Sequence, residues 1–292
     1  MPQRATTSAD YARRVLRVQQ FLADRLDEPI DPAALAREAS FSLHHFHRIF
    51  RAQMGETVMQ HVRRLRLERA ARKLRGDDAA RLLDLALEAG YESHEAFTRA
   101  FIERFGMAPS RFRSEPSARL AAWQASGAGD GPSVPVRVER FPVLRVAFTR
   151  HRGGYQGVHE TWDRLRAWAA ARGLLATSRP PLYGLCPDDP DVTAEEHLRF
   201  DACVTVDDAF ELDGGGDLVL GVEEIPAGTY AFGLHSGPYH RLSDTYLDVI
   251  GRWFPTSGFE PAPDAVVEHY LNDPSNASPA DLRTEVRVRI AD

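Results

Sequence analysis

The stretch that decides the fold of the N-terminal half is LALEAGYESHEAFTRAFIERFGMAPSRFR, residues 85–113. Its first seven residues repeat the earlier segment LAREASF (35–41), and SHEAFTRAF (93–101) repeats SLHHFHRIF (42–50) after one inserted residue. The matching positions are Ser42/Ser93, Phe46/Phe97, Arg48/Arg99, Phe50/Phe101 and Gly55/Gly106. Each copy predicts a short helix, a tight turn and a second helix capped by serine, which is the helix-turn-helix arrangement.

The rest of this half also predicts helices, so we expect residues 1–122 to form an all-α domain. Apolar residues at helical spacing predict a first helix over 9–26 and a long helix over 57–75 between the two repeats. Asp31-Pro32 marks the start of a short helix, and a further helix is expected over 79–89. The apolar faces consist of Val15, Val18, Leu22, Leu26, Val58, Val62, Leu65 and Leu74.

The C-terminal half contains a second internal repeat, with a shift of 84 residues. VERFP (138–142) matches VEEIP (222–226), and the histidine and tyrosine that follow also coincide, as His151/His235 and Tyr155/Tyr239. Each copy reads as strand, helix, strand, strand, so we expect residues 136–292 to form an α+β domain with a pseudo-twofold sheet. A cleft between the two helices of such a domain is a plausible ligand site.

Composition divides the chain at the same place. QASGAGDGPSVP (124–135) is rich in small residues and predicts a linker over 123–135. Residues 1–120 carry 21 Lys+Arg against 16 Asp+Glu, a net charge of +5, whereas residues 121–292 carry 15 against 26, a net charge of −11. A basic half joined to an acidic half indicates two partners of opposite charge.

Several classes of protein are disfavoured by the sequence. No apolar run reaches the roughly 20 residues that span a membrane, and the first ten residues lack the apolar core of a signal peptide, so we expect a cytoplasmic protein without membrane contact. The two cysteines, Cys186 and Cys203, form no Cys-x-x-Cys motif. His44 and His47 could share a metal ion, but no carboxylate or cysteine ligand lies near them in sequence, so no metal or cofactor is expected.

In each helix-turn-helix copy, the second helix is expected to enter the major groove of DNA. The phenylalanines should face the core, which leaves seven residues facing outward: His44, His47, Arg48, His94, Glu95, Thr98 and Arg99. Side chains of these types can contact base edges, for example arginine with guanine and glutamate with cytosine. The alternative is an ordinary solvated helix face.

The N-terminal half resembles the DNA-binding domain of the AraC family over about residues 9–113. The resemblance is carried by LAREASFSLHHFHRIFRAQMG (35–55) and by 85–113, with its closing G-x-x-P-S-x-x-R. It implies that two helix-turn-helix units, joined by a long helix, place their recognition helices in successive major grooves. It also implies double-stranded DNA as a partner and RNA polymerase as a further one.

The C-terminal half resembles the GyrI-like effector-binding domain, which follows an AraC-type module in Rob-like regulators. The duplicated unit and VVEHYLNDP (266–274) carry this resemblance. It implies that Glu268, with Tyr270 beside it, points into an aromatic-lined cleft that accepts amphipathic, often cationic, compounds. We expect Gly184, the equivalent of Glu268 in the first copy, to leave room beside the carboxylate.

Aromatic residues of this half could add stacking and cation–π surface to the site, although each could equally be core. The expected effector-binding set is Glu268, Tyr270, Trp162, Trp168, Tyr183 and Tyr230, and we also consider Phe232 and Trp253. An exposed Glu268, or one paired with an arginine, is the structural alternative.

The leading hypothesis is a transcriptional regulator that binds DNA and senses a small molecule, and not an enzyme. Two alternatives remain open. Some GyrI-like domains are hydrolases, and Glu268 with Tyr270 or Tyr230 could form an acid/base pair. The C-terminal domain could instead dock a protein partner.

Overall fold

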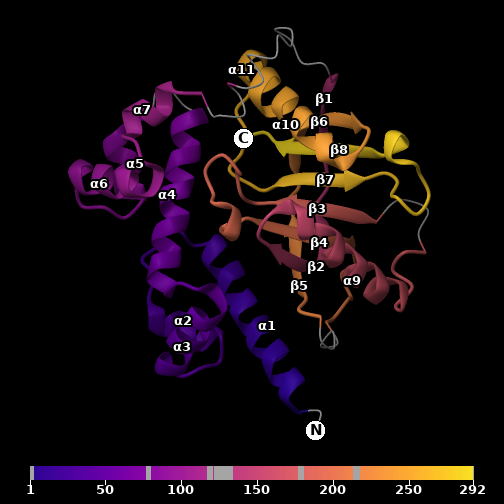
Figure 1. Cartoon of the computed structure of the whole chain (residues 1–292), viewed down its shortest axis with the longest axis horizontal. Helices are drawn as coiled ribbons and strands as arrows, with labels where there is room; N and C mark the ends of the chain where they lie inside the picture. The colour runs from indigo at the N-terminus through magenta and orange to yellow at the C-terminus, as the bar shows by residue number, and fades with distance from the viewer. Residues whose placement is uncertain are drawn as a thin grey trace. The chain divides into compact units, whose positions relative to one another are not determined.

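The computed structural model describes residues 3–76, 80–116, 121, 134–176, 181–212 and 218–291. The chain separates into two compact units, Met1–Pro116 and Ser117–Asp292. The expected linker, 123–135, lies outside the described residues except for 134 and 135. The two units are described separately below, and Figure 1 shows the elements of each.

The N-terminal unit is helical throughout its described length, as the sequence predicts. Its helices are α1 (Gln3–Ala23), α2 (Pro32–Glu38), α3 (Leu43–Met54), α4 (Val58–Gly76), α5 (Leu82–Glu88), α6 (His94–Phe105) and α7 (Pro109–Ser114). The first helix starts and ends earlier than the expected 9–26, and residues 24–27, which include the buried Leu26, form a turn after it. The long helix α4 separates the pair α2–α3 from the pair α5–α6.

The two helix-turn-helix copies agree in backbone detail. Ser42 and Ser93 cap the second helix of each copy, and their hydroxyl oxygens accept hydrogen bonds from the backbone amides of His45 (3.4 Å) and Ala96 (3.2 Å). The turn between the helices requires a left-handed residue, which is Gly90 (φ 82°) in the second copy and Ser40 (φ 54°) in the first. The same turn is therefore built with and without glycine.

The apolar residues expected in the core of this unit are buried. Phe46, Phe50, Phe97 and Phe101 are fully buried, and within each copy the two rings lie about one helical turn apart, with centroids 5.6 and 5.5 Å apart. The expected apolar faces of α1 and α4 are buried as well. Burying these phenylalanines fixes which side of α3 and of α6 faces outward.

The C-terminal unit is built on an eight-stranded sheet of antiparallel pairs. Its strands are β1 (Val136–Phe141), β2 (Leu144–Arg152), β3 (Leu182–Cys186), β4 (Arg199–Thr205), β5 (Gly221–Ile225), β6 (Gly228–Ser236), β7 (Val266–Tyr270) and β8 (Arg283–Arg289). The order across the sheet is β1-β6-β8-β7-β3-β4-β2-β5. The two sequence repeats, β1–β4 and β5–β8, therefore occupy the sheet with pseudo-twofold symmetry.

The registers of the strand pairs follow this symmetry residue by residue. Val138 on β1 pairs with Ala231 on β6, and Val222 on β5 pairs with Ala147 on β2, each position shifted by 84. The first strand of each repeat, β1 or β5, therefore pairs with the second strand of the other repeat, β6 or β2, at the edge of the sheet. The axis passes between β3 and β7, through the pair formed by Gly184 and Glu268.

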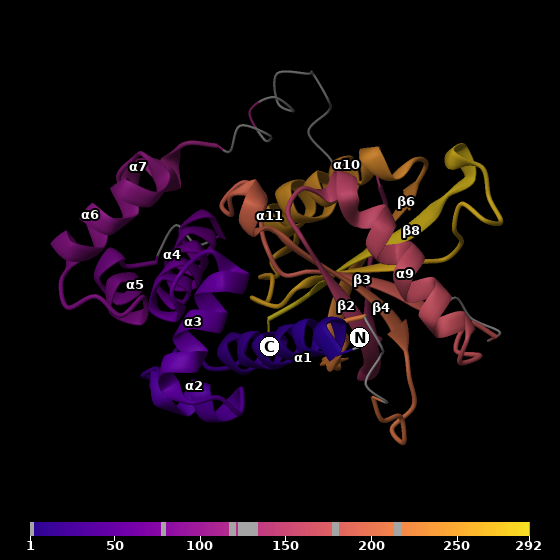
Figure 2. The ribbon, with the colours of Figure 1, turned by 60° about the horizontal axis from the view of Figure 1, so that its bottom comes forward.

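Helices from both repeats cover one face of the sheet (Figure 2). Helix α9 (Val158–Ala170) packs on β2 and β4, and α10 (Leu242–Tyr246) packs on β6. Where the sequence predicts a single helix in the second repeat, α10 continues as a π-helical segment, η4 (Leu247–Trp253), and then as α11 (Phe254–Ser257). A buried ion pair between Asp248 and Arg252 (2.6 Å) lies within the π-helical segment.

The position of Gly184 on the axis is crowded rather than open, which corrects the expectation of free space beside Glu268. A Cβ atom at residue 184 would lie 2.7 Å from Cζ of Phe200 and 3.1 Å from the hydroxyl oxygen of Tyr270. Glycine is needed here because side chains of the molecule itself already fill the space beside its Cα.

Replacing Gly184 by alanine should therefore lower the stability of the protein. We expect Gly184→Ala to reduce the free energy of unfolding by about 1–3 kcal/mol through overpacking, measured by urea unfolding followed by circular dichroism. Gly76→Ala is the matched control, because a Cβ at residue 76 would meet nothing within 4 Å. Equal unfolding midpoints for the two variants would show that Phe200 and Tyr270 adapt without cost.

Candidate functional site

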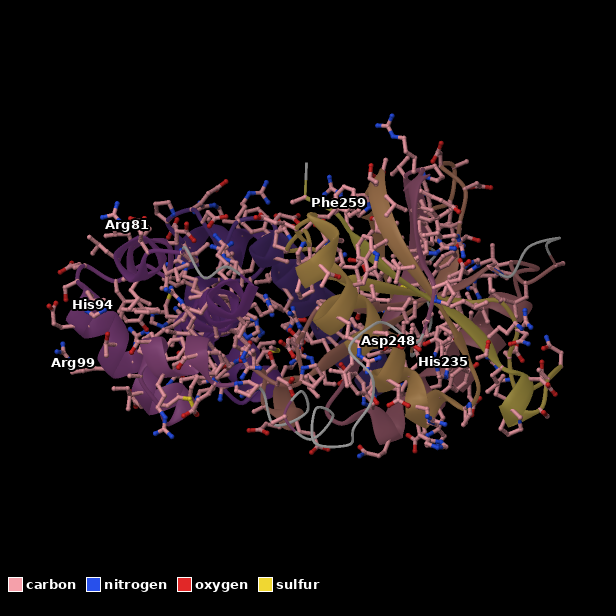
Figure 3. The ribbon with its side chains drawn as sticks, turned by 90° about the horizontal axis from the view of Figure 1, so that it is seen from above. Arg81, His94, Arg99, His235, Asp248 and Phe259 are labelled. Atoms are coloured by element: carbon pink, nitrogen blue, oxygen red, sulfur yellow. The ribbon has the colours of Figure 1, made fainter. Side chains whose placement is uncertain are left out.

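The outward side of each second helix carries most of the residues predicted to read DNA. On α3, His44, His47 and Arg48 are exposed, and on α6, Glu95 and Arg99 are exposed. His94 is half-buried at the start of α6, and Figure 3 shows His94 and Arg99 extending outward from this helix. Arg48 and Arg99 occupy equivalent positions of the repeat, so the two helices present equivalent guanidinium groups.

Two of the predicted residues on α6 make local contacts or are partly covered. Thr98 is half-buried, and its hydroxyl oxygen is buried without a hydrogen-bond partner in the described part of the chain, so this oxygen is not exposed to a base in the structure. At the N-terminus of α6, hydrogen bonds from its own backbone amide and from the Ser93 hydroxyl lower the pKa of Glu95. Glu95 is therefore ionised and stabilises the start of the helix.

The C-terminal unit contains a buried carboxyl group at its centre. Glu268 on β7 is 7% exposed. The Tyr246 hydroxyl donates a hydrogen bond of 2.7 Å to Oε1, and the Tyr270 hydroxyl donates to Oε2. The Cys186 thiol lies 3.7 Å from Oε1. Among the described residues, no arginine or lysine forms an ion pair with Glu268, and His235 is the basic side chain that acts on its charge.

Burial determines the electrostatics of this cluster. Loss of water raises the pKa of the Glu268 carboxyl above its ordinary value, although hydrogen bonds from Tyr270, Tyr246 and Cys186 favour the charged form. Burial also raises the pKa of Tyr246, Tyr270 and Cys186, and the nearby carboxylate raises them further. The three donors therefore stay protonated, and they offer Glu268 hydrogen bonds but no positive charge.

Aromatic rings surround the carboxyl group on the helix-covered face. The ring of Tyr270 contacts Trp162 of α9 (centroids 5.1 Å apart) and Tyr239 (5.6 Å), and Trp162 also contacts Phe200 (6.0 Å). Trp162, Tyr239 and Tyr246 are only half-buried, so the rings around Glu268 lie between the carboxyl group and solvent. Burial raises the pKa of Tyr239 to about 12.

The structure separates the predicted effector-binding residues into two groups. Glu268, Tyr270 and Trp162 lie together, but Tyr183 and Tyr230 lie on the opposite face of the sheet, which corrects the expectation that they share one cleft with Glu268. Tyr183 pairs with His269, the neighbour of Glu268 in β7, and successive residues of a strand point to opposite faces. The Tyr230 hydroxyl instead donates to the carbonyl of Pro226 (2.8 Å).

Trp168, the remaining predicted residue, is buried in the helix-covered core. Its indole ring packs against Phe210 (centroids 6.0 Å apart), and the guanidinium of Arg172 lies 4.7 Å from the ring. The indole N–H is buried without a partner among the residues that the structure describes. The contacts of Trp168 favour a packing role over a ligand contact.

The opposite face of the sheet carries its own charged network. Tyr183 stacks on His269 with ring centroids 4.3 Å apart, and the guanidinium of Arg287 lies over Tyr183, Phe141 and Phe232. Arg287 also donates to Glu285 (2.6 Å), which Arg137 contacts as well. The aromatic rings of this face thus already surround a cation of the protein itself.

Sequence reasoning missed Tyr246, Cys186, Phe200 and Tyr239. The shift of 84 residues could have identified two of them, because it pairs Tyr246 with Trp162 and Tyr239 with Tyr155. The duplicated histidines contact the backbone just before these rings: His235 Nε2 lies 3.3 Å from the carbonyl oxygen of Pro238, and His151 Nε2 lies 2.9 Å from that of Gly154. Within the described residues, no group of three potential metal ligands is found.

The fold and the two sites define a DNA-binding protein that carries a separate domain for a small molecule. Residues 135–291 match the family described as "GyrI-like small molecule binding domain", and residues 35–115 match the "Helix-turn-helix domain" family. The first match spans more than half of the chain. The chain belongs to the GyrI-like family and joins this domain to an AraC-type helix-turn-helix domain.

Three curated proteins illustrate the relationship. The chain is 25% identical to the right origin-binding protein of Escherichia coli K12 over 291 residues, which cover 92% of this chain and 95% of that protein. It is 29% identical to the probable transcriptional regulator YgiV of E. coli K12 over 161 residues, covering 54% and 98%. It is 34% identical to a DNA gyrase inhibitor of Serratia proteamaculans over 142 residues, covering 47% and 87%.

These matches identify the chain as a transcriptional regulator of the AraC family with a small-molecule-binding domain. No helix in the described ranges has the length and apolar character required to cross a membrane.

The exposed arginines of α3 and α6 provide a direct test of base reading. Arg99→Ala should cost about 1–3 kcal/mol in binding to the preferred duplex and relax specificity at one position, because a bidentate contact to guanine is lost. The measurement is binding to a set of duplexes with single-base changes. Arg164→Ala, an exposed arginine of α9, should leave the base preference unchanged. Equal weakening for every duplex would make Arg99 a phosphate contact.

Proposed function

We propose that this regulator responds to an amphipathic cation that binds at Glu268. The observation that carries the proposal is a buried carboxyl group that is surrounded by hydroxyls and aromatic rings and forms no ion pair with an arginine or lysine within the described residues. A buried charge is costly unless an opposite charge accompanies it, and a cationic ligand would supply that charge. The rings of Trp162 and Tyr239 would contribute cation–π contacts of about 0.5–2 kcal/mol each.

Binding at Glu268 would require the surrounding aromatic side chains to move. The carboxyl group is enclosed, and the space beside Gly184 is filled by Phe200 and Tyr270. Trp162, Tyr239 and Tyr246 are the half-buried members of the enclosure, so they are the side chains that a ligand would displace first. A ligand with flat apolar groups would replace the ring contacts that these residues lose.

At the DNA, we propose that His44, His47, Arg48, His94, Glu95 and Arg99 face the bases, with α3 and α6 in successive major grooves. Thr98 would contribute by packing rather than by base contact, because its hydroxyl oxygen is buried. Arginine contacts to phosphates release counterions, so affinity should fall steeply with added salt. Cytoplasmic location and contact with RNA polymerase stay predictions from the sequence.

A hydrolase activity of the C-terminal unit is a second candidate, favoured by one observation. Glu268 lies within hydrogen-bond distance of two tyrosine hydroxyls, an arrangement that could move a proton to or from a bound compound. The relationship to a DNA gyrase inhibitor supports a third candidate, in which this unit docks a protein. The experiment on Glu268 separates the first two candidates.

Replacing Glu268 by glutamine keeps the shape of the side chain and removes its charge. We expect Glu268→Gln to weaken the lipophilic cation tetraphenylphosphonium about tenfold to hundredfold, since opposite charges about 6 Å apart attract each other by roughly 3 kcal/mol at an effective dielectric constant of about 20. Binding of neutral triphenylphosphine oxide should change little. Isothermal titration calorimetry of the full chain measures both ligands.

Glu224→Gln, an exposed strand carboxylate, is the matched control and should bind both compounds like the wild type. Equal loss of both compounds in Glu268→Gln, or loss of neither, would contradict the role of the charge. Turnover of a bound ester that stops in Glu268→Gln would favour the hydrolase instead.

The raised pKa of Glu268 predicts that cation binding depends on pH. The cation requires the ionised carboxyl group, so affinity should be lost as pH falls through the pKa of Glu268, by about tenfold for each pH unit below it. Because burial raises this pKa, the loss should begin at a higher pH than for an ordinary glutamate. Titrations from neutral to mildly acidic pH measure the slope, and a slope that persists in Glu268→Gln would assign it to another group.

A further inference from the structure

A chain of charged side chains connects the two helix-turn-helix copies along α4. Glu56 follows the last residue of α3 by two positions, and its Oε1 lies 2.7 Å from both His61 Nδ1 and Arg64 Nη2. Arg64 also reaches Glu68, one turn further along α4, with its Nη1 3.2 Å from Oε2. Arg104, in the last turn of α6, donates to Oε1 of Glu68 across 2.8 Å. We call these five residues the α4 relay.

The centre of the relay is buried. Glu68 is 1% exposed and His61 is 1% exposed, whereas the side chain of Arg104 is 26% exposed at the second end. Hydrogen bonds and charges from His61 and Arg64 outweigh burial and lower the pKa of Glu56 to about 2, so the first end is an ionised carboxylate. Each buried carboxylate is therefore held by a guanidinium, and Arg64 is shared between both.

The stability of the folded unit does not by itself explain why these charged side chains are buried. Well-packed apolar side chains often stabilise a helix interface as well as a buried ion pair does. An ion pair differs from them in requiring one geometry, because a carboxylate and a guanidinium bond strongly only at fixed distances and angles. The α4 relay thus restricts how α3 and α6 are placed on α4, where apolar contacts alone would tolerate small shifts.

The two ends of the relay lie close to the C-caps of the two recognition helices. Glu56 directly follows Gly55, the C-cap of α3, and Arg104 lies two residues before Gly106, the C-cap of α6. Both recognition helices are therefore tied to α4 at their C-terminal ends, which leaves their N-terminal halves facing outward. The first copy has Gln53 where the second has Arg104, so α3 has no guanidinium group at the position from which α6 contacts Glu68.

We propose that Glu68 is a positioning residue for DNA recognition, which sets the spacing between the two DNA segments that α3 and α6 read. In helix-turn-helix dimers, the recognition helices read duplex segments about one helical turn, roughly 34–36 Å, or a multiple of it, apart. The α4 relay holds α3 and α6 in one relative orientation, and Glu68 is the residue that joins its two ends. This proposal rests on the proposed use of both helices in successive grooves.

Selection of binding sites from duplexes containing about three helical turns of random sequence tests the proposal. From the wild-type chain we expect two sequence boxes at a single spacing. From Glu68→Gln we expect the same two boxes at several spacings. Affinity for the wild-type spacing should fall about tenfold if the correct orientation is then populated in one molecule of ten.

Two further variants keep the experiment decisive. Arg104→Gln breaks only the link to α6. It should also give the two sequence boxes at several spacings. If Glu68→Gln does not fold, Arg104→Gln takes its place in the experiment. Glu88→Gln is the matched control: Glu88 forms an exposed ion pair with Lys73 (2.6 Å) between α4 and α5, and its loss should leave a single spacing.

The outcomes separate the proposal from the function on which it rests. A single unchanged spacing in folded Glu68→Gln or Arg104→Gln would overturn the positioning role, even if affinity falls, because weaker folding alone lowers binding to every duplex equally. A single sequence box from the wild-type chain would overturn the use of both helices, and the positioning role with it.

Discussion

The C-terminal unit depends on one antiparallel contact, the pairing of β3 with β7 where the two repeats meet. The pseudo-twofold axis passes through Gly184 and Glu268, so one position of the repeat is placed directly beside its own copy. Two carboxylates there would repel each other, and the space beside residue 184 is already filled by Phe200 and Tyr270. The difference between glycine and glutamate at this one position places one buried carboxyl group, that of Glu268, on the pseudo-twofold axis of a nearly symmetric sheet.

Two buried glutamates, Glu68 in the N-terminal unit and Glu268 in the C-terminal unit, are held in opposite ways. In the N-terminal unit, Glu68 is bonded to two guanidinium groups, which fix its geometry and leave it no capacity for a ligand. In the C-terminal unit, the donors that Glu268 receives from the described residues are hydroxyl and thiol groups, whose protons satisfy its oxygens without balancing its charge. The first arrangement is suited to holding helices in a fixed geometry. In the second, the charge of Glu268 is left for a bound cation to balance.

Most of the fold could be predicted from the sequence, because both halves are duplicated. The serine caps, the buried phenylalanines and the pairing of Gly184 with Glu268 all follow from aligning each half with itself. The alternation of side chains along β3 also predicts that Tyr183 points away from the face of Gly184, because successive residues of a strand point to opposite faces. The π-helical segment and the buried ring contacts of Glu268 could not be predicted, because they depend on tertiary packing rather than on local sequence.

The exchange of edge strands has a consequence for how the C-terminal unit forms. Strand β1 pairs with β6 and β5 pairs with β2, so neither repeat can complete its own part of the sheet. During synthesis, β1 emerges long before its partner and has no neighbour until the second repeat follows. Contacts so distant in sequence slow the folding of a domain. Either repeat on its own would therefore lack the strand that pairs with its second strand at the edge of the sheet.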